Sequence, residues 1–521
     1  MHPNHKHVVM VASENGALSG GKVGGVGDVI RDLPRALAEM GWSVTTIIPS
    51  YGFLHRQNKT LSEREIVFPF GGHRHTALVR RVDHDGELPG ITHLLVDHPD
   101  IKGNPIYFND PPETPFLRDS AKYAMFCSAV GQLLKTVREP YFLHLHDWHA
   151  ATLLLLAELH PEFSHLREVH TAFTIHNLSI QGTRPMRNHP SSLEGWFPEL
   201  FKSTGWVSLW QDLRYYEPCY TPMAVGIRFA DKINTVSPTY AREILRASDP
   251  STGAFRGEGL EKFLQNAAAG NRLFGILNGC EYPSPFRMER LDFSCFADAA
   301  LKDLEHHPDK FVSGELDESV FRLQGFREHK PEIILTCVTR IVEQKVRLFF
   351  QECADGVTAI DHLVRMLEER NGIFVVLGSG VAEYEEAFRK YCNNHRRIVF
   401  LKGYFEHTSH LLYANGDLFL MPSLFEPCGI SQMIAMREGQ PCVVHAVGGL
   451  KDTVIDMENG FTFWGNSLPS AAQDFVSATD RAMHIFSNEK PQWEDIKAQA
   501  KAARFTWEQS AREYIELMYA E

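Results

Sequence analysis

The feature that most constrains this 521-residue chain is a repeated alternation of short apolar runs with amphipathic stretches. Each apolar run ends in a polar residue or a glycine, and helical spacing of apolar residues follows several of them. The opening shows the unit once: "HVVMVAS" (7–13), a glycine-rich loop, "GDVIRDLPRALAEMG" (27–41) and "WSVTTIIPSYG" (42–52). This order of strand, loop, helix and strand predicts a parallel, doubly wound α/β sheet.

The alternation runs along the chain with one break. The further strands that we expect are residues 142–147, 171–177, 232–237, 273–279, 332–340, 372–380, 397–404, 417–423 and 441–449. Between about 281 and 330 the sequence turns proline-rich and charged, which we interpret as a linker. We therefore predict an α/β domain over 1–280, a linker over 281–330, a second α/β domain over 331–504, and a C-terminal helix in 505–521 that packs back on the first domain.

Bulk composition excludes several classes of protein. The formal net charge of −13 argues against a nucleic-acid or anionic-membrane surface. The sequence has no run of about 18 apolar residues, so we expect no membrane span, and its start shows no secretory pattern. Nine cysteines are scattered without a CxxC pair, which favours reduced thiols over disulfides or a zinc site. We expect a cytoplasmic protein.

Two sheets in one chain imply a cleft, with ligands at the carboxyl ends of the strands. The loop after the first strand contains Lys22, Gly24 and Gly25 at the start of a predicted helix. It fits neither the P-loop nor the dinucleotide fingerprint, because the lysine precedes the glycines and the glycines stand far from the strand. Bare backbone amides at a helix start attract anions, and Lys22 adds a charge. The alternative is a mobile surface turn.

Two more strand ends in the first half carry polar groups. "HLHDWHA" (144–150) places Asp147 among histidines, where it could hydrogen-bond a polyol. Asp147 could instead cap a helix, and a metal site has no diagnostic spacing here. "TIHNLSIQG" places His176 and Asn177 at the next strand end, where a lone histidine is more often structural than catalytic.

In the second half, Arg340 and Lys345 follow a predicted strand. Two fixed cations suit a diphosphate leaving group without a metal, although a solvated charge pair is the alternative. Gly378, in "LGSG", lies in a turn that could pass close to a ligand. In "FEPCGISQ", Glu426 precedes a predicted helix start whose amides could hold phosphate, with Ser431 as a hydroxyl donor. Together these positions favour a nucleotide-diphosphate cleft.

Longer strings carry a family resemblance. "KVGGVGDVIRDLPRAL", "HLHDWHA", "TIHNLSIQG", "NTVSPTYAREI", "FEPCGISQMIAMREG" and "FTWEQSAREYIELM" occur in order between residue 22 and about residue 518. With them the chain resembles glycogen and starch synthases, the fifth family of glycosyltransferases. The resemblance implies the GT-B fold, two Rossmann-like domains facing across a deep cleft. It implies retaining transfer of glucose from ADP-glucose, or UDP-glucose in some relatives, to the non-reducing end of an α-1,4-glucan. It implies no metal and no other cofactor.

The resemblance also implies which residues contact the donor. The substrate-binding residues that it implies on this side are Lys22, Gly24, Gly25, Gly378, Tyr404, Cys428, Gly429, Ile430 and Ser431. Among them, Tyr404 would stack on the nucleobase, and the residues around Gly429 would offer phosphate contacts. Arg340 and Lys345 would neutralise the leaving diphosphate.

The sugar-side roles also follow from the resemblance. Glu426 would hold donor glucose hydroxyls and stabilise the developing oxocarbenium charge. His176 would contact the donor sugar near its 6-hydroxyl, while Asp147 and Asn177 would line the sugar and acceptor side. Glu426, Arg340, Lys345, His176 and Asp147 are thus the expected catalytic residues.

The chain departs from the family pattern at several positions. Val346 stands for a glycine, Val381 for an acid and Leu424 for an arginine, while "TPMAVG" (221–226) lacks an asparagine and a lysine. These changes leave the acceptor and the donor base open. The alternatives are a retaining glycosyltransferase with another acceptor or with UDP-glucose, and a weakly active, glucan-binding regulatory homologue. Oligomeric state is not indicated.

Overall fold

The computed structural model describes residues 6–83, 88–103, 105–108, 110–111, 113–139, 141–202, 214, 218–249, 252–282, 291–305, 321–325 and 329–520. The described chain divides into two compact α/β units. Unit 1 consists of Met1–Ala247, Arg256–Gly279 and Trp507–Glu521, and unit 2 of Ser248–Phe255 and Cys280–Thr506. Much of the predicted linker, 281–330, lies outside the described residues.

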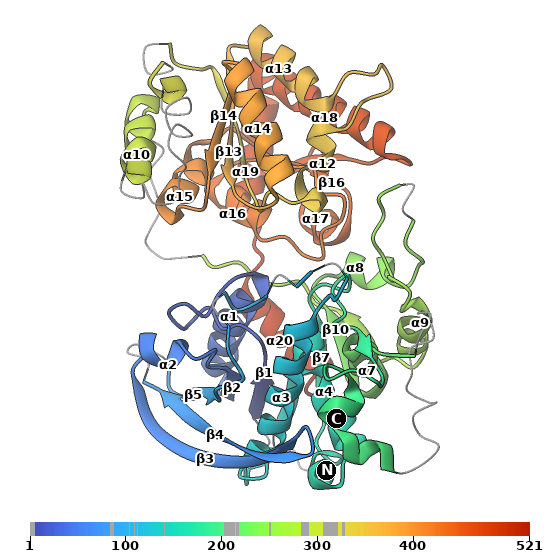
Figure 1. Cartoon of the computed structure of the whole chain (residues 1–521). Helices are drawn as coiled ribbons and strands as arrows, with labels where there is room; N and C mark the ends of the chain where they lie inside the picture. The colour runs from blue at the N-terminus through green and yellow to red at the C-terminus, as the bar shows by residue number, and fades with distance from the viewer. Residues whose placement is uncertain are drawn as a thin grey trace. The chain divides into compact units, whose positions relative to one another are not determined.

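Unit 1 is built on a nine-stranded sheet in the order β11-β10-β7-β6-β1-β2-β5-β4-β3 (Figure 1). Its strands are β1 (His7–Val11), β2 (Ser43–Pro49), β3 (Thr60–Phe70), β4 (His73–Val82), β5 (Ile91–Asp97), β6 (Phe142–His146), β7 (Thr171–Ile175), β10 (Lys232–Thr235) and β11 (Leu273–Gly275). The strands from β11 to β5 are parallel, and the hairpin β3–β4 adds an antiparallel edge.

Helices cover the unit 1 sheet. They include α1 (Gly25–Glu39), α3 (Leu117–Leu134), α4 (Asp147–Leu159), α7 (Pro222–Phe229) and α20 (Trp507–Leu517). Helix α4 packs against both α3 and α7, and α20 packs against α1 (Figure 1). Because α20 follows unit 2 in the chain, unit 1 is completed by residues more than 200 positions beyond its last strand.

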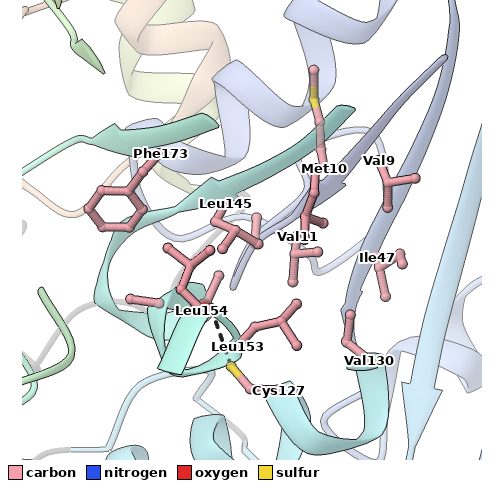
Figure 2. Packing of buried hydrophobic residues seen from close by; sticks show 14 of the residues in the cluster. Val9, Met10, Val11, Ile47, Cys127, Val130, Leu145, Leu153, Leu154 and Phe173 are labelled. Atoms are coloured by element: carbon pink, nitrogen blue, oxygen red, sulfur yellow. Dashed lines mark hydrogen bonds between the residues drawn. The ribbon is translucent and has the colours of Figure 1, made fainter. Parts of the chain in front are cut away.

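The central strand of the unit 1 sheet, β1, is buried and apolar on both faces. Strand β1 contributes Val9, Met10 and Val11, all fully buried, because helices cover both sides of a doubly wound sheet. Figure 2 shows Val11 among side chains from the adjoining strands and helices, and Cys127 of α3 lies within hydrogen-bonding distance of carbonyls in α4. The near-continuous apolar runs noted in the sequence are therefore core strands.

Unit 2 has a six-stranded parallel sheet in the order β14-β13-β12-β15-β16-β17. The strands are β12 (Ile333–Val338), β13 (Gly372–Gly378), β14 (Ile398–Lys402), β15 (Leu418–Met421), β16 (Cys442–His445) and β17 (Gly460–Phe463). Numbered by appearance within the unit, this order is 3-2-1-4-5-6, the order of a Rossmann sheet. The topology itself therefore identifies unit 2 as Rossmann-like.

The two faces of this sheet bury different side chains of the same strand. Phe374 and Val376 of β13 join one apolar cluster, whereas Ile373, Val375 and Leu377 join another. This division follows from the period of two along a strand. The second cluster also contains Phe296 of α10 (Phe293–Glu305), so the described part of the predicted linker includes a helix packed into unit 2.

The strands predicted from the sequence are confirmed, with ends that shift by up to four residues. The hairpin β3–β4, strand β5 and strand β17 were not predicted. Helix α1 continues through Pro34, where the sequence suggests a kink or a restart. The C-terminal helical stretch is divided into α19 (Lys490–Ala502) and α20. Among the described residues, no helix combines the length and the apolar character needed to cross a membrane.

Candidate active site

Each sheet contains a switch point, where two neighbouring parallel strands lead on to strands in opposite directions along the sheet. In unit 1 this point lies between β1 and β6, and in unit 2 between β12 and β15. Connections on the two sides of such a point run to opposite faces, which leaves a crevice at the carboxyl ends of the two strands. Most of the residues predicted from the sequence follow one of these four strands.

Backbone amides of the glycine loop after β1 are hydrogen-bonded to a carboxylate side chain of the protein itself. Oε2 of Glu14 accepts hydrogen bonds from the backbone N–H groups of Val23, at 2.7 Å, and Gly24, at 2.6 Å. Glu14 is buried, and its Oε1 accepts a hydrogen bond of 2.6 Å from the hydroxyl of Tyr107. The sequence predicts that these amides are bare. They are instead hydrogen-bonded to a carboxylate that lies just beyond the end of β1.

The remaining groups of this loop are more accessible. Lys22 is half-exposed, and its Nζ lies 2.6 Å from Oδ1 of Asp28 in the first turn of α1. Gly25 begins α1, and a Cβ built on it would meet no atom within 4 Å. An incoming anion could use the open space at the start of α1 and the charge of Lys22, which is paired with one carboxylate.

Asp147 binds the next strand end. Oδ1 of Asp147 accepts a hydrogen bond of 2.7 Å from the backbone N–H of His176. Asp147 is the first residue of α4, has φ 55°, and does not act as the helix cap considered in the sequence analysis. Burial raises the pKa of Asp147 to about 7, although the hydrogen bonds from the amides of His176 and Asn177 lower it.

Burial disfavours the charged form of the histidines at this edge. Nδ1 of His146 lies 3.0 Å from Nε2 of His176, so one ring donates to the other. Burial lowers the pKa of His176 to about 3 and that of His146 well below its usual value. Within the described ranges, the group that brings three potential metal ligands together is His75, His98 and Asp100, and it does not include the "HLHDWHA" stretch.

Asn177 and Trp148 have local structural partners. The Oδ1 of Asn177 accepts hydrogen bonds from the backbone and the hydroxyl of Ser179, which closes the turn after β7. Trp148 is buried, and the Cα of Gly182 approaches it so closely that a Cβ there would lie 2.1 Å from the indole. Gly182, which also has φ 70°, is therefore needed for packing against Trp148.

An ion pair at the unit 2 edge joins Lys345 and Glu426. Nζ of Lys345, in α12 (Glu343–Phe350), forms an ion pair with Oε2 of Glu426, from the loop after β15. The lysine side chain is 12% exposed and the glutamate side chain 7%. The hydroxyl of Ser423 lies 3.3 Å from the same oxygen. The two strands of the switch point thus bring together the predicted cation and the predicted carboxylate.

Arg340 also follows β12, and it is exposed. Within the described part of the chain, no ion pair engages its guanidinium. Gly378 ends β13, and Gly380, two residues later, pairs with Ile341 in an isolated bridge. A Cβ at Gly378 would lie 1.9 Å from the carbonyl oxygen of Thr339. The glycine turn is therefore explained by close approach to the loop that carries Arg340.

A glycine pair sets the position of the Glu426 loop. The backbone N–H of Gly449 donates to the carbonyl of Glu426 at 3.1 Å. A Cβ at Gly448, which has φ 44°, would lie 1.8 Å from that carbonyl oxygen, and a Cβ at Gly449 would lie 2.2 Å from the carbonyl oxygen of Cys428. The strand-end glycines after β16 therefore let the "FEPCG" loop pack directly on their backbone.

The residues after Glu426 lead into helix α16 (Ser431–Glu438). Gly429 has φ 78°, Ile430 is the N-cap residue, and Cys428 is buried. No side chain caps this helix start. Burial raises the pKa of Tyr413, and the neighbouring side chain of Ser431 lowers it. Tyr404, in the loop after β14, is 60% exposed.

The departures from the family pattern fall mostly in apolar cores. Val346 is fully buried on α12, and Leu424 is buried against a cluster that includes Leu468. Residues 221–226 form the start of α7, with Met223 and Val225 buried in unit 1. Val381 is different, because it is 46% exposed and is the N-cap residue of α14 (Ala382–Asn394).

Two residues of the unit 1 edge were missed in the sequence analysis. Glu14 had a signal, since it is an acid placed three residues beyond the end of the first strand. Tyr107 had none, because it lies in an irregular segment and meets Glu14 from 93 residues away.

Comparisons with known proteins agree with this geometry. A family model described as the starch synthase catalytic domain matches residues 7–266, and one described as glycosyl transferases group 1 matches residues 332–483. The chain is 32% identical over 505 residues to a glycogen synthase of Desulfitobacterium hafniense, covering 95% of both proteins. It is also 32% identical over 532 residues to a glycogen synthase of Moorella thermoacetica, covering 99% of this chain and 96% of that protein.

Solved structures add the fold. The catalytic domain of starch synthase IV from Arabidopsis thaliana, bound to ADP and acarbose, matches with a TM-score of 0.73 and 26% identity over 99% of both chains. A sucrose-phosphate synthase from Thermosynechococcus elongatus matches in fold alone, with a TM-score of 0.54 and 15% identity over 98% of both chains. With two Rossmann-like units and relatives aligned over nearly its full length, the chain belongs to the glycogen and starch synthase family of glycosyltransferases, enzymes of the GT-B fold.

Proposed function

We propose that this chain transfers glucose from ADP-glucose to the non-reducing end of an α-1,4-glucan, with retention of configuration. The observation that carries the proposal is the Lys345–Glu426 pair at the switch point of a Rossmann-like sheet, in a chain of this family. The curated relatives are glycogen synthases, and the starch synthase IV structure is bound to ADP and acarbose. These comparisons support a nucleoside-diphosphate sugar and a glucan as substrates.

The first role is neutralisation of the leaving group. Departure of the nucleoside diphosphate builds negative charge on phosphate oxygens, and preorganised cations lower the cost of that charge. Lys345 and Arg340 both follow β12 and supply two cations. The uncapped start of α16, with Gly429, Ile430 and Ser431, adds backbone amides. Cys428 and Gly378 belong to the loops that carry these groups.

The second role is recognition of the donor sugar and base. Glu426 would accept hydrogen bonds from glucose hydroxyls and offset the positive charge that develops at the anomeric carbon. Its carboxylate is held by Lys345 and Ser423, so it is oriented before the substrate arrives. Tyr404 presents an exposed ring on which a nucleobase could stack.

The third role belongs to unit 1. The resemblance assigns Lys22, Gly24 and Gly25 to the diphosphate and the sugar end of the donor. It assigns His176 to the donor sugar, and Asp147 and Asn177 to the sugar and acceptor side. Asp147 supports this assignment indirectly, since its bond to the backbone of His176 fixes the strand end that carries both His176 and Asn177.

The test is transfer of radiolabelled glucose from ADP-glucose and, separately, from UDP-glucose into glycogen by the purified protein. We expect incorporation from ADP-glucose and a loss of at least a hundredfold in the Glu426→Ala variant. Incorporation from UDP-glucose alone would overturn the donor assignment, and equal activity in the variant would overturn the site.

The absence of incorporation from either donor would overturn the proposed reaction. Saturable binding of ADP without transfer would then point to another acceptor, and saturable binding of glucan alone to a regulatory homologue. A cytoplasmic location is part of the same proposal, and it is supported by nine free cysteines.

A further inference from the structure

Helix α3 buries an ion pair that none of the roles above uses. Nζ of Lys122 lies 2.6 Å from Oδ1 of Asp119, and the two side chains are only 2% and 5% exposed. Burial lowers the pKa of Lys122 and raises that of Asp119, and in each case the partner opposes the shift. Because desolvation of both charges offsets much of their attraction, a buried pair is weak evidence for stability alone.

The pair holds a short irregular segment. Nζ of Lys122 donates to the carbonyl oxygen of Ile106 at 2.6 Å, and Oδ2 of Asp119 accepts from the backbone N–H of Phe108 at 3.0 Å. The two contacts lie on either side of Tyr107, in residues 105–108, which belong to no helix or strand. Without a hydrogen-bonded ladder of its own, this segment depends on the pair for its placement.

Tyr107 then carries the contact to the end of β1. Its hydroxyl donates to Oε1 of Glu14 at 2.6 Å and lies 2.8 Å from the hydroxyl of Ser13. The other oxygen of Glu14 accepts from the amides of Val23 and Gly24. The series of contacts therefore leads from the ion pair to the glycine loop.

A second series starts from the same lysine. Nζ of Lys122 lies 5.2 Å from the centre of the Tyr51 ring and 4.7 Å from that of Tyr123. The Tyr51 hydroxyl donates to the carbonyl oxygen of Ser13 at 2.6 Å and lies 3.0 Å from the Tyr123 hydroxyl. The first series thus reaches Glu14 and Ser13, and the second reaches Ser13, in the segment that follows β1 at the switch point.

We propose that Asp119 and Lys122 are positioning residues that place the Tyr107 hydroxyl against Glu14 and thereby fix the glycine loop. The pair touches neither Lys22 nor the loop amides, so it acts through Tyr107. Its loss lets residues 105–108 move, weakens the hold on Glu14 and frees the amides of Val23 and Gly24. The catalytic consequence rests on the proposed function, whereas the consequence for the loop does not.

The first test is independent of activity. Hydrogen exchange is measured by mass spectrometry on peptides that span residues 18–26, in wild type, Lys122→Met, Asp119→Asn and Tyr107→Phe. We expect exchange in these peptides to accelerate at least tenfold in all three variants. Unchanged exchange in the folded variants would overturn the proposal. If Lys122→Met does not fold, Asp119→Asn and Tyr107→Phe decide the outcome.

The matched control is Arg80→Met. Arg80 forms a half-buried ion pair with Asp97, with 3.1 Å between Nη2 and Oδ2, on neighbouring strands of the same sheet. Arg80 lies on β4, and its loss should leave the exchange of residues 18–26 unchanged. Acceleration in this control equal to that in Lys122→Met would assign the effect to general destabilisation and overturn the proposal.

The second test is a double-mutant cycle on kcat/KM for Lys122→Met and Tyr107→Phe. If Lys122 acts through Tyr107, the double variant loses no more than the worse single variant, and KM for the donor rises more than kcat falls. Losses that multiply would overturn the proposal. An inactive wild type would overturn the proposed function instead, and the hydrogen-exchange result would still stand.

Discussion

At the carboxyl ends of the strands, the carboxylates of the two units have different kinds of partner. In unit 1, Glu14 and Asp147 accept hydrogen bonds from backbone amides. In unit 2, Glu426 faces the ammonium group of Lys345 and a hydroxyl. A backbone amide cannot leave its place without moving the chain, whereas a lysine side chain can rotate toward another anion. In unit 1 the carboxylates therefore fix loops, whereas in unit 2 the carboxylate is paired with a side chain that is free to rotate.

The largest effect is expected when one charge of the unit 2 pair is removed. Glu426→Ala and Lys345→Ala should each lower turnover on the order of a thousandfold, because a preorganised charge at the reacting centre is lost. Steady-state transfer assays measure this effect. Arg347→Ala is the matched control, since Arg347 lies on the same helix and its pair with Glu343 is exposed. Normal turnover in both variants would show that the pair is structural.

In unit 2, substitution of Arg340 should affect turnover without affecting stability. Because its guanidinium is exposed, Arg340→Ala should lower turnover on the order of a hundredfold and leave the free energy of unfolding unchanged. Lys345→Ala should lower both, since it leaves the Glu426 charge buried without a cation. Urea denaturation and transfer assays on the same preparations measure the difference. A matching loss of stability in both variants would contradict the distinction.

Asp147 is suited to measuring how a buried carboxylate of unit 1 changes the free energy of unfolding with pH. Its folded-state pKa, about 7, lies above the ordinary value of 3.8, so its contribution to stability is fully present below pH 3.8. That contribution is lost as the pH rises through 7, and it amounts to on the order of 4 kcal/mol at most. Asp147→Asn should remove this dependence. Denaturation curves between pH 4 and 8 measure it, and parallel pH profiles for variant and wild type would exclude it.

The smallest expected effect concerns the departure at Val381. An acid at the N-cap of α14 would accept hydrogen bonds from amides of the first turn, so Val381→Asp should raise the free energy of unfolding by about 0.5–1 kcal/mol. Chemical denaturation measures the gain, and Val381→Ala is the control without a cap. Because Val381 is exposed, turnover should change little. A large change in turnover would place this helix start among the groups that contact substrate.

Much of the fold could be predicted from the sequence because its strands are short, apolar and bounded by polar or glycine residues. The same rule located Lys345, Glu426, Asp147 and His176, since each lies shortly after a strand. The hairpin β3–β4 escaped because its strands carry many charged residues, as an edge hairpin with one solvated face can. Local pattern thus predicts what lies at a strand end, and it does so best in the parallel core.

Partners distant in the sequence could not be predicted. The Tyr107–Glu14 bond joins an irregular segment to a strand end, and neither has a periodicity that implies the other. The occupied amides of Val23 and Gly24 were read as bare for the same reason. At Val346 the family resemblance drew attention to a missing glycine, whereas the structure gives the position a role in the core. Resemblance identifies changed positions, and packing is needed to interpret them.

The assignment of α20 to unit 1 has a consequence for the order in which the protein folds during synthesis. Trp507 and Tyr514 of this helix are buried in the core of unit 1, and the Tyr514 hydroxyl accepts a hydrogen bond of 3.0 Å from Asn234 of β10. Residues 280–506 leave the ribosome before this helix does. Unit 1, although its strands are made first, therefore cannot complete its core until α20 has been made.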